Sequence, residues 1–207
     1  MVDGKMTGVE KLFYITWKLM QLTFLFHLLT ILGGVVFGIG PAWETIVTLF
    51  LETKSYEKNY SIKRAFSVWK SSFVKANLCF WLFSFIAIFL VFNLYWSIQF
   101  QNLLFWMVSF LIMLAIVIDF MMYVYLIFYN AEYDIPLWEN IKLSFISVFL
   151  SFKQFLLTML ALFGVLALTW QYKGLYLFLT FGLLVLFLHL MTQPNRQLID
   201  QMIESDQ

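Results

Sequence analysis

Two ionisable side chains inside long apolar blocks are the first candidates for chemistry in this sequence. Asp119 lies near the middle of block 103–129, and His27 lies near the middle of block 12–36. A charged group at bilayer depth is costly, so such residues indicate function by default. Paired, they would form a proton relay or contact a substrate. The alternative, which we favour, is that each makes an interhelical hydrogen bond that fixes packing.

Three further polar residues lie in or beside the apolar blocks. Asn93 is expected to serve helix packing. Glu44 follows Pro41, which predicts a position in the first turn of a helix at the outer surface. A carboxylate there complements the helix dipole, or lines an outer vestibule. His189 is expected to reach the membrane interface from the end of the last block.

Catalytic motifs are absent from the sequence. It contains no Gly-x-Ser-x-Gly, His-Glu-x-x-His, Cys-x-x-Cys or glycine-rich phosphate loop. Cys79 is the only cysteine, which excludes an intrachain disulfide and a metal site built from several cysteines. A net charge of +1 argues against a nucleic-acid partner. We therefore expect a protein that is not an enzyme and that uses no cofactor or metal.

The elements that carry these residues are predicted to be membrane helices. The chain is 62% hydrophobic and only 12% charged, which a soluble domain of 207 residues cannot accommodate. We predict an all-α polytopic membrane helix bundle, with one membrane domain over 1–192 and a cytoplasmic tail over 193–207. Short turns would join six transmembrane helices into three hairpins. The predicted crossings are 12–36, 41–56, 77–97, 103–129, 154–170 and 174–191.

The basic residues predict the orientation of the crossings. Of the 13 Lys and Arg residues, only Lys173 falls on one side of the predicted membrane. The positive-inside rule therefore makes the other side cytoplasmic, together with both termini. The residues on that side are Lys5, Lys11, Lys18, Lys54, Lys58, Lys63, Arg64, Lys70, Lys75, Lys142, Lys153 and Arg196.

The second apolar block fits either a membrane crossing or a re-entrant segment. Gly38-Ile39-Gly40-Pro41 ends the first helix, and the proline is suited to start the next. The segment 41–56 is short for a crossing, at roughly 24 Å. A re-entrant segment is the alternative, but it would destroy the charge asymmetry, so a crossing is favoured.

Two cytoplasmic segments have the pattern of interfacial amphipathic helices. Ile62-Lys63-Arg64-Ala65-Phe66 is echoed by Ile141-Lys142-Leu143-Ser144-Phe145, and each copy precedes a crossing. The echo reflects either an internal duplication or convergence on one pattern. The basic character of 54–75 also suits anionic lipid head groups as a partner.

Two stretches carry a resemblance to a known family. Gly38-Ile39-Gly40-Pro41-Ala42 is similar to a Thr-Ile-Gly-Pro-Ala motif of the YesL family of small bacterial membrane proteins. The residues Phe66, Trp69, Lys70, Phe73 and Lys75 are similar to the Phe- and Lys-rich stretch that follows it in that family. Gly38 replaces the usual Thr, and Ser72 replaces the usual Asn. The resemblance implies a Gram-positive plasma membrane and association with ABC importers of sugars and oligosaccharides.

Three functional hypotheses follow. The leading one is a non-catalytic accessory subunit that docks on the permease subunits of a carbohydrate ABC importer. The second is a self-standing transporter or channel that uses Asp119 and His27. The third is that the chain is itself an importer permease. It is disfavoured because Ala131-Glu132-Tyr133, the nearest match to the ATPase-gripping loop of such permeases, has no glycine after it before Gly164.

Overall fold

The computed structural model describes residues 8–52 and 60–205, and this part of the chain is helical apart from short connections. An all-α fold is therefore confirmed. The helices are α1 (Gly8–Leu32), α2 (Ile39–Glu52), α3 (Ile62–Ser97), α4 (Leu103–Glu132), α5 (Leu137–Leu150), α6 (Phe152–Gln171), α7 (Gly174–Phe178) and α8 (Thr180–Ser205).

Four of these helices have the length and hydropathy needed to cross a membrane. They are α1, α3, α4 and α6. Helix α2 has only 14 residues, which corresponds to about 21 Å and is shorter than a typical hydrocarbon core of about 30 Å. The last predicted crossing is divided between the five-residue α7 and α8. The number of six crossings is therefore not confirmed.

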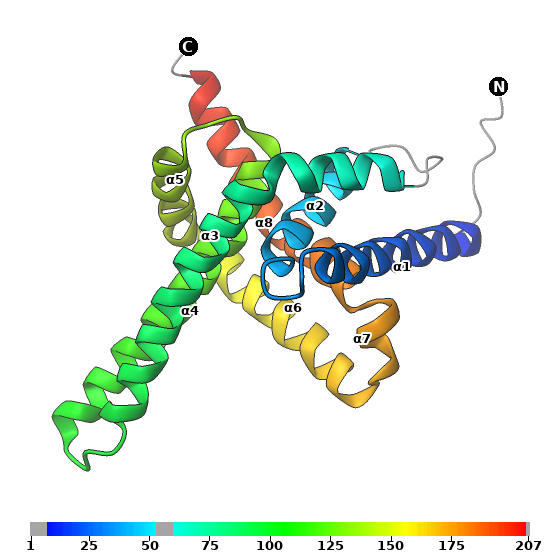
Figure 1. Ribbon diagram of the computed structural model, residues 1–207. Coiled ribbons are helices and arrows are strands. Elements are labelled where there is room, and N and C mark those ends of the chain that lie inside the picture. Colours follow the sequence, from blue (N-terminus) through cyan, green and yellow to red (C-terminus); the bar gives the residue numbers. More distant parts are fainter. Residues whose placement is uncertain (1–7, 53–59, 206–207) are drawn as a thin grey trace.

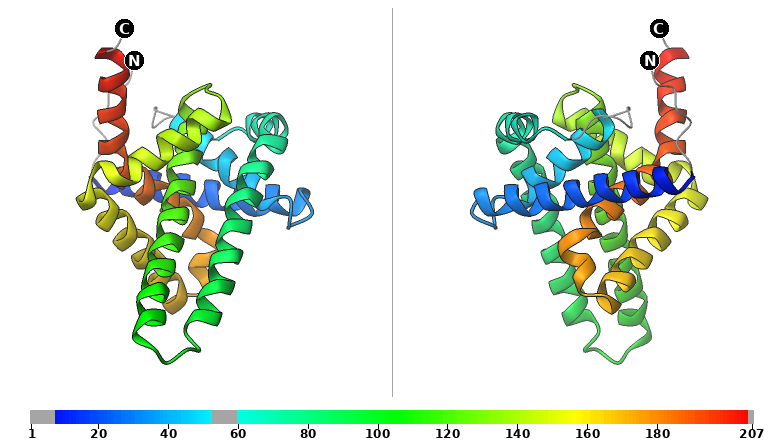
Figure 2. Two further views of the ribbon diagram at one scale, coloured as in Figure 1. Left: turned by 90° about the vertical axis from the view of Figure 1, so that its left-hand side faces the viewer. Right: turned by 90° about the vertical axis from the view of Figure 1, so that its right-hand side faces the viewer.

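The bundle has two distinct ends (Figures 1 and 2). The α3–α4 turn and the α6–α7 turn lie at one end, called here the turn end. The start of α3, the α4–α5 loop and the end of α8 lie at the opposite end, called the terminal end. The start of α3 carries Arg64 and Lys70, whereas Lys173 lies beside the α6–α7 turn. These three basic residues thus lie at opposite ends of the bundle, and the predicted orientation of the crossings stays a prediction.

Helix α1 departs from the expected hairpin arrangement. Figure 2 shows α1 crossing the long α3–α4 hairpin instead of running alongside it. Where α1 meets α8, a Cβ atom on Gly182 would lie only 2.3 Å from the Leu19 carbonyl oxygen. The Gly182 amide donates a hydrogen bond to Thr23 Oγ1 at 2.9 Å. A glycine in α8 is thus required for this close crossing.

The first predicted interfacial helix is part of a longer element. Residues 62–76 continue without interruption into the membrane segment as the 36-residue helix α3. No glycine or proline separates the two parts. Ser71 and Ser72 donate to the Val68 carbonyl, at 2.9 and 3.0 Å. Such back-bonding often accompanies helix bending, and Figure 1 shows α3 turning near this region as it enters the hairpin.

The core of the fold surrounds α2. This helix packs against α1, α3, α4 and α8. Its apolar side chains Ala42, Ile46 and Val47 are completely buried. A short helix enclosed by longer ones buries most of its surface, so α2 holds the bundle together from within.

The predicted cytoplasmic tail is not a separate segment in the structure. Helix α8 continues through Pro194 to Ser205. Asn195, Arg196 and Ile199 are all buried, at 1%, 3% and 3% exposure. The first part of the tail therefore packs against the rest of the bundle.

Candidate functional site

The Gly-Ile-Gly-Pro-Ala stretch starts the central helix α2, and its small residues allow close packing. A Cβ atom on Gly38 would lie 2.2 Å from the Thr30 carbonyl oxygen. One on Gly40 would lie 2.7 Å from Phe80 Cβ in α3. Ala42 has no exposed surface. The motif was predicted as the break between helices, but the turn covers residues 33–38 and Ile39 to Ala42 already belong to α2. Its small residues bring α2 against its neighbours.

A chain of polar side chains begins two residues after this motif and joins three helices. Asn130 of α4 donates to Glu44 Oε2 in α2 at 3.5 Å. Asn140 of α5 donates to Asn130 Oδ1 at 2.6 Å. Glu44 is only 5% exposed and Asn140 is fully buried. The expectation that Glu44 lies at the outer surface is wrong, because α3 and α4 cover this part of α2.

Arg196 forms a second buried polar centre at the terminal end. Its Nη1 pairs with the Glu132 carboxylate, at the end of α4. Its Nη2 donates to His189 Nδ1 at 2.8 Å, one and a half to two turns earlier in α8. The guanidinium carbon lies 4.5 Å from the ring centroid of Phe128. His189 is therefore half-buried and packs against Arg196 and the Phe128 ring, and the expectation that it reaches the membrane interface stays a prediction.

Neighbouring residues extend this centre into a contact between α8 and the α4–α5 pair. Asn195 Nδ2 donates to Tyr125 Oη at 2.9 Å and to the Ser147 carbonyl at 3.1 Å. Tyr129 Oη and Ser147 Oγ are 2.7 Å apart. Tyr133 Oη donates to the Asp200 carboxylate. The C-terminal half of α8 is thus attached by side-chain hydrogen bonds as well as by apolar contacts.

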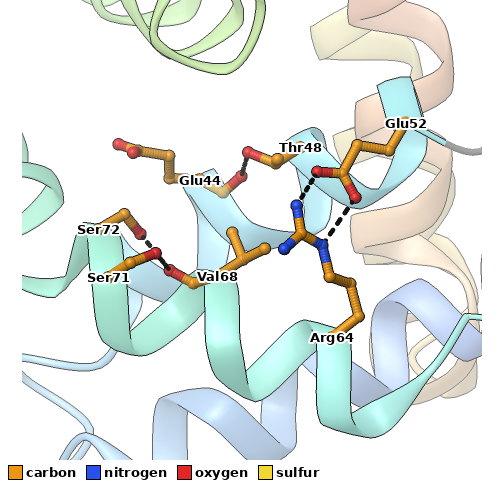
Figure 3. A network of polar contacts seen from close by, with 7 residues as sticks. All are labelled: Glu44, Thr48, Glu52, Arg64, Val68, Ser71 and Ser72. Carbon is orange, nitrogen blue, oxygen red and sulfur yellow. Dashed lines mark hydrogen bonds and ion pairs between the residues drawn. The ribbon is translucent and has the colours of Figure 1, made fainter. Parts of the chain in front are cut away.

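An exposed ion pair connects the end of α2 with the start of α3 (Figure 3). Arg64 Nε donates to Glu52 Oε2 at 3.1 Å, and its Nη2 donates to Oε1 at 2.5 Å. The two side chains remain 55% and 39% exposed. An exposed pair of this kind contributes little to stability, so its main effect is to orient the two helix ends.

The basic and aromatic residues of the family-like stretch lie on α3. Phe66 and Trp69 stack with ring centroids 5.7 Å apart, and Trp69 meets Phe73 edge to face at 4.8 Å. Lys70 is exposed, whereas Lys75 is half-buried. The three aromatic side chains form a continuous ladder along the part of α3 that precedes the hairpin.

The structure does not bring His27 and Asp119 together. His27 Nε2 lies 3.2 Å from the Tyr176 carbonyl oxygen in α7, and its ring packs against Phe181. Asp119 is 8% exposed and makes no hydrogen bond or ion pair with the described residues. Asn93 donates to the Phe89 carbonyl of its own helix at 2.7 Å, which is a local packing role.

Within residues 8–52 and 60–205, no group of three or more His, Cys, Asp or Glu side chains is arranged to hold a metal ion. Cys79 is buried and lies 3.9 Å from Asn130 Nδ2.

Arg196 was not predicted to lie in the interior, because it belongs to a segment that has the composition of a polar cytoplasmic tail. A signal was present in the spacing of His189, Gln193, Arg196, Gln197 and Asp200. These residues recur at intervals of three, four and seven and share one helical face. A proline at position 194 concealed the continuity of that face.

Comparison with known proteins gives one match. Residues 19–94 match the family described as "Protein of unknown function, DUF624". The match is well under half of the chain, and it contains the whole of α2 and most of α3. Proteins of the YesL family carry this region. No curated protein and no solved structure matches the chain. Residues 19–94 are therefore similar to this family, in a chain whose described part is helical and includes several helices suited to a membrane.

Proposed function

We propose that the protein is a non-catalytic accessory subunit of a carbohydrate ABC importer, a member of the YesL family in a Gram-positive plasma membrane. It docks on the permease subunits and stabilises or regulates uptake. In this proposal both termini are cytoplasmic, and the start of α3 lies on anionic lipid head groups, where its lysines and arginine face the membrane surface.

The observation that carries the proposal is the exposure of the α3–α4 hairpin. Only 6% of the most apolar stretch of α4, and 11% of that of α3, is buried inside the bundle. Toward the turn end, the large side chains Trp106, Met107 and Phe110 are each more than 60% exposed. An apolar helical face of this size takes lipid or the helices of a partner equally well.

The grouping of polar side chains adds support. Glu44, Asn130, Asn140 and Arg196 form contacts that hold helices of the same chain together. These polar side chains hold helices together and are therefore not free to contact a solute. This arrangement is more typical of an accessory subunit than of a transporter.

The family-like residues support the proposal by their position. The DUF624 match contains both stretches on which the resemblance to the YesL family depends. The association with sugar importers comes from that resemblance, and it identifies the permease subunits as the partner to test.

The test is an affinity purification of the tagged full chain from native membranes in mild detergent, with partners identified by mass spectrometry. We expect sugar-importer permeases at near-stoichiometric yield. Recovery of the chain alone at normal abundance would contradict the proposal. A variant with Asp119→Asn should retain the partners, because an accessory role does not need this carboxyl group.

One observation favours a second function, that of a self-standing transporter. Asp119 is a nearly buried carboxyl group with no hydrogen bond or ion pair among the described residues. Intramembrane carboxyl groups often mark ion or substrate pathways. In this alternative, liposomes containing only this protein would move a solute, and Asp119→Asn or His27→Ala would stop the flux. If both variants leave function intact, the proton-relay hypothesis is excluded.

A further inference from the structure

A cavity of about 530 Å³ lies between the end of α2, the end of α4 and the C-terminal half of α8. Its size falls within the range of small-molecule sites. All of its lining residues belong to the described part of the chain. It lies at the terminal end, beside the buried Arg196.

One wall of the cavity is a polar face of α8. His189, Gln193, Arg196, Gln197 and Asp200 contribute side chains to it. The two glutamines make no hydrogen bond with the described residues. A carboxamide presents both donors and an acceptor, so this wall offers unused hydrogen-bonding capacity of both kinds.

The opposite wall is formed by α2 and α4 and has apolar surface. Phe50, Leu51 and Ala131 supply it, and the Phe50 ring also contacts the His189 ring at a centroid distance of 5.3 Å. The carboxylates of Glu52 and Glu132 border this apolar surface. A cavity in which apolar surface lies beside polar groups suits a ligand that carries both apolar and polar atoms.

The charges of the cavity argue against an anionic ligand. Three carboxylates line it, from Glu52, Glu132 and Asp200, and two guanidinium groups balance them in part: Arg196 in the lining and Arg64, which pairs with Glu52 from outside it. A phosphate or carboxylate ligand would meet an excess of like charge at close range.

Arg196 gives an independent indication of a ligand. Its side chain is 3% exposed and lines the cavity, and its Nε–H has no hydrogen-bond partner within the described residues. A buried donor without an acceptor is costly. A ligand oxygen that reaches this guanidinium would remove that cost.

We propose that this cavity binds a small, neutral polyhydroxylated molecule. A hydroxyl group can accept from Arg196 or a glutamine amide and at the same time donate to a carboxylate such as Asp200. An ammonium group can only donate, and a phosphate oxygen only accepts. The carbon face of a ring-shaped polyol packs on Phe50 and Leu51, while its hydroxyl groups meet the α8 wall.

Only the physiological meaning of this site rests on the proposed function, and the binding itself does not. In an importer subunit, a polyol site at the cytoplasmic end would report the internal level of the imported compound. Polyol binding and recovery of permeases are separate measurements, so either proposal can fail while the other stands.

The test is isothermal titration calorimetry with the purified full chain in nanodiscs, since glycoside detergents would compete for the site. The probes are glucose, maltose, raffinose and inositol, with glucose 6-phosphate and putrescine for comparison. We expect at least one neutral polyol to bind, and to bind more tightly than either charged probe.

A matched pair of variants locates the binding. The double variant Gln193→Leu/Gln197→Leu removes both carboxamides without breaking a hydrogen bond between described residues, and should weaken polyol binding by about fivefold or more. Gln171→Leu, an exposed glutamine at the turn end, should leave binding unchanged.

Three results would overturn the proposal. One is the absence of binding heat for every neutral polyol up to about 10 mM, well above the range of a millimolar dissociation constant. The second is tighter binding of putrescine or glucose 6-phosphate. The third is polyol binding that the double variant leaves intact, because the site would then lie elsewhere.

Discussion

The region around α2 and the turn end of the α3–α4 hairpin are built in opposite ways. Around α2, buried apolar side chains surround a chain of polar contacts, and four other helices pack against it. At the turn end of the hairpin, most large side chains are exposed. The two helices are joined there by Ser109, which donates to Ser97 Oγ at 2.8 Å.

The two regions therefore have different roles: residues around α2 and α8 stabilise the fold, and the outer face of the hairpin is available for recognition. Residues around α2 and α8 have partners within the chain, so substitutions there should unfold the protein. Residues on the outer face of the hairpin have lipid or another protein as their only neighbours, so substitutions there should alter association and leave folding intact.

The largest effect is expected at Arg196. Arg196→Met removes the guanidinium and leaves Glu132 and His189 without their partner. Breaking a buried ion pair in this way should lower the free energy of unfolding by about 3 kcal/mol. The matched variant Arg64→Met breaks the exposed pair with Glu52 and should change stability little. Thermal unfolding in detergent micelles measures both, and equal losses would contradict the assignment of Arg196 to the interior.

The next effect is expected at Gly182. Gly182→Ala places a methyl group against the α1 backbone at Leu19 and should cost about 1–3 kcal/mol through overpacking. Gly164→Ala in α6 has no atom within 4 Å of the added Cβ. It should stabilise the helix by about 0.5–1 kcal/mol. The same unfolding assay compares the two, and a stable Gly182→Ala variant would show that α1 and α8 do not cross closely.

A smaller effect is expected at Asn140. Asn140→Leu removes the amide that donates to Asn130 Oδ1 and should lower stability by about 1 kcal/mol. Asn93→Leu on the hairpin removes only a bond to the carbonyl of its own helix and should be neutral. Unfolding midpoints of the two variants in the same micelles provide the measurement. A neutral Asn140→Leu would mean that the polar chain does not join α5 to α4.

The smallest effect on stability is expected on the exposed hairpin face. The double variant Trp106→Ala/Phe110→Ala removes two largely exposed rings and should leave the unfolding midpoint unchanged. Recovery of permease subunits in the affinity purification should fall severalfold, because large aromatic residues dominate interface energies. Undiminished recovery would place the docking surface elsewhere.

Much of the fold could be predicted from hydropathy and from the positions of helix-breaking residues. Apolar blocks predicted most of the helices. A break was predicted at Gly38 to Pro41, but α1 ends earlier, at Leu32, and the chain turns over residues 33–38, with Gly34 at a φ of 72°. The crossing angle of α1 was not readable, because it depends on a contact between Thr23 and Gly182, which lie 159 residues apart. The continuity of α3 was misjudged because the change from amphipathic to apolar pattern was interpreted as a boundary.

The residues of the candidate site were harder to predict from the sequence than the fold. Glu44 was identified as a candidate, but its burial depends on α3 and α4, and its partner Asn130 was not identified. Arg196 and His189 were assigned to a surface because both lie near the end of the last apolar block. Their orientation depends on contacts with Glu132 and Phe128 on α4. The sequence around residues 189–196 does not predict contacts with such distant residues.

The proposed accessory role requires that the exposed face of the α3–α4 hairpin contacts a permease subunit. The most direct test is site-specific photo-crosslinking in native membranes, with a photoreactive amino acid at Phe110 and, as the control, at the fully buried Met121 of the same helix. We predict a protein adduct containing a sugar-importer permease from position 110 and none from position 121. Adducts from position 110 that contain only lipid would contradict the claim.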